Sequence, residues 1–170
     1  RIEKMIKGQN GFTLMDAFLE LIDNFIDAGA KIIELTFENG NLKITYNNGT
    51  AMNEKELLAY YTLDSQNKRY NIEDKGQMGI GGTEANARLS GPEGKHYLYN
   101  KHESKDAECI VTDYDMLLKS SHKDCWSKCD GIYGKKITEE DKKNIKAGVT
   151  TKFENSISHN FRLLDVLTNI

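Results

Sequence analysis

A predicted helix near the start of the chain carries an acidic stripe and no cation. Spaced at helical intervals, the stripe consists of Asp16, Glu20, Asn24 and Asp27. Like charges one turn apart destabilise a helix by about 0.2–0.5 kcal/mol per pair, and a bound cation removes that conflict. Mg²⁺ favours carboxylate and amide oxygens and usually takes few protein ligands together with phosphate oxygens. The alternative is the ordinary solvated face of an amphipathic helix.

Two residues of this stripe predict chemistry on a phosphate group. Asn24 would ligate Mg²⁺ through its side-chain oxygen, and Glu20, one turn earlier, would deprotonate a water molecule. The activated water would then attack a terminal phosphate in line with the bond that breaks. The stripe therefore predicts a metal-assisted phosphate site on the exposed face of this helix.

A glycine-rich stretch supplies the second candidate element. Four of the seven residues from 76 to 82 are glycine, and a predicted helix follows. A glycine backbone can curl and present N–H groups, and a helix start adds partial positive charge, so both features favour a bound phosphate. The alternative is a flexible loop. The stretch contains no P-loop string, and it does not follow a strand as a dinucleotide-binding turn does.

Periodicity predicts the elements that must position these residues. Alternating patterns predict strands at 31–38, 42–46, 95–100, 107–113 and 149–154. Helical spacing predicts helices at 13–28, 53–61, 83–89 and 138–146 and from 158 onward. Thr13 and Asn53 resemble capping-box residues of the first two helices. Because strands and helices do not alternate strictly, the order predicts an α+β fold rather than a doubly wound sheet.

Composition limits the class of protein without choosing a partner. The chain has 170 residues, 38% of them hydrophobic, which predicts one domain over residues 1–170. The net charge of −3 argues against a nucleic-acid binder, and no run is apolar enough to span a bilayer. Three cysteines favour a reducing compartment, the cytoplasm or nucleus. Because the chain begins at Arg1, we expect an excised N-terminal part of a longer protein.

A zinc site is a weaker interpretation of the same sequence. Cys125 and Cys129 lie near His122, but the spacing lacks a CxxC pair and a clear fourth ligand. Scattered thiols and surface histidines are the commoner explanation.

The acidic stripe and the glycine stretch together resemble the GHKL ATPases. That family includes DNA gyrase, the ninety-kilodalton heat-shock chaperones, MutL and MORC proteins, and histidine kinases. Its first motif resembles residues 20–28, which makes Glu20 the hydrolytic glutamate and Asn24 the metal-binding asparagine. Its third motif, a phosphate loop, resembles the residues Gly76, Gln77, Met78, Gly79, Ile80 and Gly81. The resemblance implies a mobile lid at about 61–75.

Two further motifs match the family less closely. The second, usually Asp-x-Gly-x-Gly, corresponds to Asn47 and Gly49 followed by Met52. An Asn side chain both donates and accepts, so recognition of a base other than adenine stays open. In the fourth motif Val149 stands where the family has Thr, so Thr150 or Thr151 must substitute. Thr150 is the expected nucleotide contact, although strand alternation puts the two threonines on opposite faces.

The resemblance also implies a fold and a function. The fold would be the Bergerat-type two-layer α/β sandwich, with helices on one face of a mixed sheet. The function would be binding and slow hydrolysis of ATP with Mg²⁺, with nucleotide-dependent lid closure and homodimerisation. Nucleic acid or a client protein would be engaged only through the parent protein. Two alternatives are a histidine-kinase-type phosphotransfer domain and a scaffolding module without turnover.

Overall fold

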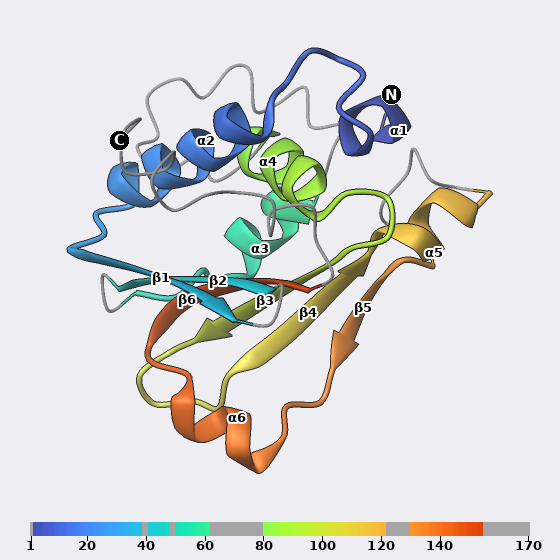
Figure 1. Cartoon of the computed structure of the whole chain (residues 1–170). Coiled ribbons are helices and arrows are strands. Elements are labelled where there is room, and N and C mark those ends of the chain that lie inside the picture. The colour runs from blue at the N-terminus through green and yellow to red at the C-terminus, as the bar shows by residue number, and fades with distance from the viewer. Residues whose placement is uncertain (1, 39–40, 48–49, 62–79, 122–129, 155–170) are drawn as a thin grey trace.

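The computed structural model of the chain describes residues 2–38, 41–47, 50–61, 80–121 and 130–154. A six-stranded sheet in the order β1-β2-β6-β3-β4-β5 is its framework (Figure 1). The strands are β1 (Ile32–Glu38), β2 (Asn41–Asn47), β3 (Lys95–Lys101), β4 (Glu108–Asp113), β5 (Ile132–Lys135) and β6 (Gly148–Glu154). Five of the six strands correspond to predicted strands, within one or two residues at each end.

All five strand pairings among the described residues are antiparallel, whereas the prediction was a mixed sheet. The long helical connection from β2 to β3 does make these two strands run in the same direction. They are not neighbours, however, because β6 lies between them and runs antiparallel to both. Strand β6 therefore converts a potential parallel pair into two antiparallel pairs.

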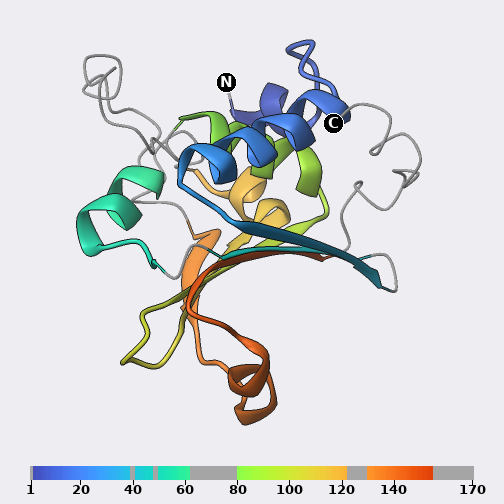
Figure 2. The ribbon, with the colours of Figure 1, turned by 90° about the vertical axis from the view of Figure 1, so that its left-hand side faces the viewer.

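Most of the helices cover one face of this sheet. They are α1 (Ile2–Ile6), α2 (Leu14–Asp27), α3 (Glu54–Tyr61), α4 (Ile80–Ser90), α5 (Tyr114–Lys119) and α6 (Glu139–Asn144). Turned by 90°, the molecule shows α2 and α4 lying above the sheet and α6 below it (Figure 2). This arrangement confirms the predicted two-layer α/β sandwich. No described helix has the length and apolar character needed to cross a membrane.

Helix α2 forms as its sequence predicts and anchors the main core. The Thr13 side chain accepts a hydrogen bond from Asp16 N at 3.0 Å, and the Asp16 carboxylate accepts one from Thr13 N at 2.9 Å. This capping box satisfies two backbone donors that the helix itself cannot. Gly29, with φ of +82°, adopts the left-handed conformation that ends many helices. The buried face of α2 packs on the sheet residues Leu42, Ile44, Leu98, Val149 and Phe153.

A second, smaller core lies on the opposite face of the sheet. It consists of Tyr97, Tyr99, Cys109, Val111, Ile137 and Ile145. The two isoleucines flank α6, a helix that buries none of its own residues. The segment around α6 therefore covers part of the far face, which the prediction of helices on one face did not include.

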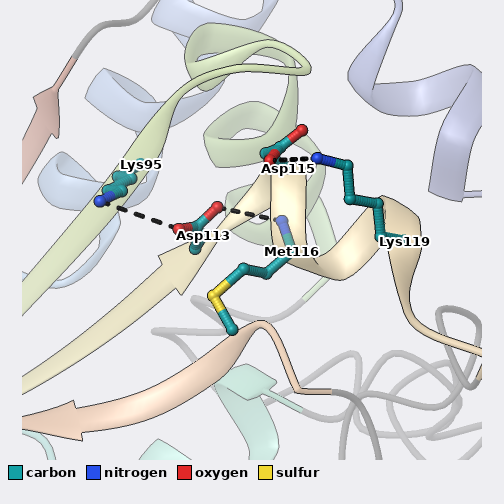
Figure 3. A network of polar contacts seen from close by, with 5 residues as sticks. All are labelled: Lys95, Asp113, Asp115, Met116 and Lys119. Carbon is teal, nitrogen blue, oxygen red and sulfur yellow. Dashed lines mark hydrogen bonds and ion pairs between the residues drawn. The ribbon is translucent and has the colours of Figure 1, made fainter.

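Three short elements, α1, α5 and β5, were not predicted from the sequence. Helix α5 begins after Asp113, whose side chain accepts a hydrogen bond from Met116 N at 3.1 Å and lies 3.8 Å from Lys95 Nζ (Figure 3). The Asp115–Lys119 ion pair, at 2.8 Å, spans one turn of the same helix. Elements of four to six residues are too short to show a hydrophobic period, so local capping and tertiary contacts determine whether they form.

Candidate functional site

Helix α2 presents three of the predicted site residues on one stripe. Glu20 and Asn24 are partly buried, and Asp27 is exposed at the end of the helix. Leu21 and Phe25 point into the core beside them, both at 2% exposure. The stripe therefore runs along the edge of the buried face, where one side of the helix meets the protein interior and the other meets solvent.

Asn24 lines a small cavity between α2, α3 and the sheet. The other lining residues are Leu21, Phe25, Tyr60, Leu98, Val149 and Thr151. The cavity volume is about 10 Å³, which is room for about one water molecule. Its walls are almost entirely apolar, although Asn24, Tyr60 and Thr151 are among the lining residues. Because ligand pockets usually measure about 300–1,000 Å³, this cavity must widen before it admits a base.

The Asn24 side chain also has an unsatisfied polar atom. Its amide nitrogen is buried and has no hydrogen-bond partner among the described residues. Buried polar groups in native proteins are nearly always hydrogen-bonded, and leaving one unpaired costs about 1–3 kcal/mol. The orphaned amide is therefore suited to a bound molecule that supplies the missing partner.

Strand β6 settles which threonine faces the helices. Thr151 lines the cavity, and its hydroxyl donates to Ile44 O at 3.5 Å. Thr150, the expected contact, is paired with Thr45 and Tyr99 and lies on the far face of the sheet. The structure therefore brings Thr151, and not Thr150, together with Asn24.

The segment after β2 contributes Met52 to the same region. Met52 is 4% exposed and belongs to the main core with Leu21, Tyr60 and Val149. Both its backbone groups are bound by the Asn100 side chain at 2.8 Å. Asn47 is the last residue of β2, where it pairs with Ile32, and Gly49 lies outside the described residues.

The glycine cluster is described only at its end. Gly76, Gln77, Met78 and Gly79 lie outside the described residues, whereas Ile80 and Gly81 form the first turn of α4. Two residues further along α4 contact Tyr60, which lines the cavity. The Thr83 hydroxyl donates to Tyr60 O at 2.8 Å, and the Asn86 amide donates to the Tyr60 hydroxyl. These contacts fix the first half of α4 against α3, next to the cavity.

Tyr60 and Asn100 are site residues that sequence reasoning missed. Tyr60 stands at the end of the predicted helix 53–61, and no spacing pattern distinguishes it from a core tyrosine. Asn100 lies 48 residues from its partner Met52, so only the folded sheet reveals their contact. A buried asparagine in an alternating strand was the one available signal, because such a residue must find hydrogen-bond partners.

The described residues contain no cluster of three or more His, Cys, Asp or Glu that would hold a metal alone. A magnesium ion does not need one, because phosphate and water oxygens complete its shell. Asn24, with Glu20 nearby on the same helix, supplies oxygen donors of the kind that Mg²⁺ prefers. The alternative zinc ligands His122, Cys125 and Cys129 lie outside the described residues.

Comparison with known proteins identifies the family. No sequence among curated proteins matches the chain. One similar solved structure, the N-terminal domain of a DNA repair protein, is 16% identical, with a TM-score of 0.49, and the match covers 84% of this chain and 37% of that one. Residues 12–125 match the family model described as histidine kinase-, DNA gyrase B- and HSP90-like ATPase. Because this match covers about two thirds of the 170 residues, the chain belongs to the histidine kinase-, DNA gyrase B- and HSP90-like ATPase family.

Proposed function

We propose that this ATP-binding family member is a Mg²⁺-dependent module that hydrolyses ATP through Glu20 and Asn24. The observation that supports it best is the buried amide nitrogen of Asn24, a donor without an acceptor among the described residues. Asn24 also lines a cavity together with Thr151 and Tyr60. Glu20 precedes Asn24 by one turn of α2, so both side chains project to the same side.

In this proposal the two ends of the nucleotide meet different parts of the chain. The base lies toward Leu98, Val149 and Thr151, with Asn47, Gly49 and Met52 at its edge. The phosphates lie toward Asn24 and Asp27 and the start of α4, where backbone N–H groups of Ile80 and Gly81 have no partner within the helix. Residues 76–79, which precede this helix start in the sequence, would bind the same phosphates. The Asn24 side-chain oxygen would hold Mg²⁺, whose chemistry there would be to neutralise phosphate charge.

Glu20 has the role of general base. The partly buried Glu20 carboxylate lies at the edge of the buried face of α2. It can accept the proton of a water molecule that attacks the terminal phosphate. Glu20→Gln keeps the size and hydrogen-bonding capacity of the side chain but removes its basicity. We expect the ATP turnover rate to fall about 10²- to 10⁴-fold while the Kd for ATP changes little.

Steady-state phosphate release and calorimetric Kd values test this role together. Glu103→Gln, in the exposed loop after β3, is the matched control, and it keeps the wild-type rate. Asn24→Ala is expected to lower both turnover and the Mg²⁺ dependence of binding. Equal phosphate release from wild type, Glu20→Gln and Asn24→Ala would refute the hydrolytic proposal.

A second candidate is a module that binds or scaffolds without turnover. The small size of the cavity favours it. So do Asn47, Ala51 and Val149, which stand in place of the Asp and the last Gly of the family's second motif and the Thr of its fourth. Titration calorimetry with ATP, GTP and ADP in the presence of Mg²⁺ separates the candidates. Binding without phosphate release supports this second candidate, and absence of binding to all three nucleotides supports a scaffold. Phosphate transfer to a histidine of a partner would instead support the kinase-type alternative.

A further inference from the structure

The Asn100 side chain forms a two-point clamp on the backbone of Met52. Its amide oxygen accepts from Met52 N at 2.8 Å, and its amide nitrogen donates to Met52 O at 2.8 Å. Asn100 is 2% exposed and Met52 is 4% exposed, so water does not compete for these bonds. The side chain thus acts as a short strand partner for a segment that belongs to no strand.

The clamp sits at the end of the sheet that borders the cavity. On the register of the sheet Asn100 is paired with Val149, and Val149 is paired in turn with Tyr46. Val149 is also a wall of the cavity. Asn100 therefore fixes the backbone of Met52, which packs in the same core cluster as Val149.

An amide is the side-chain group best suited to this task. It offers an acceptor and a donor side by side, which match the N–H and C=O of one residue. A carboxylate can only accept, so an Asp at this position would face the Met52 carbonyl without a proton to share. An alanine would leave both buried backbone groups without a partner, which is unfavourable.

We propose that Asn100 is a positioning residue for the base-binding end of the site. It holds Met52 in the place where the base is recognised, and it does not touch the phosphates. This inference rests on the proposed function, because it assumes that a nucleotide base lies beside Val149 and Thr151. It adds a residue from outside all the sequence motifs to the determinants of base binding.

Asn100→Asp tests the clamp through two ligands that share phosphates but not a base. The probes are ATP and inorganic tripolyphosphate, each with Mg²⁺ and each measured by calorimetry. We expect the Kd for ATP to rise about tenfold, while the Kd for tripolyphosphate stays within about twofold of wild type. A role in overall stability alone would weaken both ligands equally.

Two control variants separate positioning from general damage. Asn144→Asp makes the same chemical change on α6, where the Asn144 amide donates to Glu140 O at 3.3 Å. Val111→Ala destabilises the second core on the far face of the sheet without touching Met52. Neither control is expected to change the ratio of the two Kd values.

A measurement on the wild-type chain keeps the inference testable if Asn100→Asp does not fold. In nuclear magnetic resonance spectra, the side-chain amide signals of Asn100 are expected to shift on addition of ATP and to stay in place with tripolyphosphate. Equal loss of both ligands in Asn100→Asp, or no shift with ATP in a wild type that binds it, would overturn the role of Asn100. A wild type that binds neither ligand would instead overturn the proposed function.

Discussion

At the scale of single residues, the decisive feature is which side chains share the cavity with Asn24. Strand β6 presents Thr151 there and turns Thr150 to the far face, although the two are adjacent in sequence. The chemistry of the pair is identical, so sequence alone left the assignment open. Only the register of β6 against β2 and β3 distinguishes them, because a shift of one residue exchanges the faces.

Replacing each threonine with valine tests this assignment. Thr151→Val removes a hydroxyl from the cavity and keeps the volume of the side chain, so we expect the Kd for ATP to rise about three- to tenfold. Thr150→Val is the matched control, and its Kd is expected to stay within about twofold. Calorimetry measures both values. A larger loss in Thr150→Val than in Thr151→Val would contradict the placement of the base.

His96 makes a separate prediction about stability and pH. It is 1% exposed beside Phe153, and burial lowers its pKa from 6.5 to about 3. Below pH 6.5 His96 is protonated in the unfolded chain, whereas in the folded chain it stays neutral down to about pH 3. The free energy of unfolding therefore decreases as the pH falls through this window. Between pH 7 and about pH 5 this costs about 2 kcal/mol of unfolding free energy.

Urea unfolding of wild type and His96→Gln at both pH values measures that cost. Glutamine has a similar size and does not titrate, so the variant is expected to lose about 2 kcal/mol less than wild type on acidification. The comparison uses the difference between the two pH values, which removes the direct effect of the substitution. The same loss in both proteins would show that His96 is not the source.

At the scale of elements, local capping signals were the most reliable part of the sequence. Asn53 and Glu56 form the predicted box at the start of α3, with Asn53 Oδ1 accepting from Glu56 N at 2.8 Å. Thr138 likewise caps α6, accepting from Asp141 N at 3.1 Å. Capping contacts lie within three residues, so the sequence contains all the information needed to predict them.

Replacing two threonine caps tests how strongly the stability contribution of a cap depends on the packing of its helix. Thr13→Ala is expected to lower the unfolding free energy by about 1 kcal/mol, because α2 is part of the main core. Thr138→Ala is expected to cost clearly less, because α6 buries no residue and can fray without exposing the core. Urea denaturation of both variants gives the two values. An equal or larger loss in Thr138→Ala would contradict this account.

The elements that the sequence did not predict were those that depend on distant partners. Strand β5 has four residues and exists because it pairs with β4, with Tyr133 opposite Val111. Helix α4 begins at Ile80, inside the glycine cluster, whereas the sequence placed the helix start at 83. Its glycines have poor helix propensity, so residue propensities did not predict the early start.

At the scale of the whole molecule, the sandwich and its family could be predicted, but the arrangement of the sheet could not. The sequence shows five strands and their turns, but their order is set by β6, which inserts between β2 and β3. The clamp of Asn100 on Met52 joins residues that are 48 positions apart in the sequence. The contact of Tyr60 with Thr83 of α4 joins residues that are 23 positions apart. Contacts of this kind follow from topology and leave no local pattern.

We also expect nucleotide-dependent assembly of the whole molecule. With Mg²⁺ and a non-hydrolysable ATP analogue, the chain is expected to sediment as a homodimer, because the bound nucleotide stabilises the associating state. Removal of Mg²⁺ with a chelator is expected to return it to the monomer. Asn24→Ala is expected to stay monomeric under both conditions. Identical sedimentation of wild type with and without the analogue would argue against nucleotide control of assembly.

The central claim, that α2 binds a magnesium-bound nucleotide through Asn24, is tested most directly by one crystal structure. It would contain the chain with Mg²⁺ and a non-hydrolysable ATP analogue. We expect the metal to contact the Asn24 side-chain oxygen and the base to lie in the widened cavity between Leu98, Val149 and Thr151. A nucleotide bound elsewhere on the molecule, or a metal without contact to Asn24, would contradict the claim.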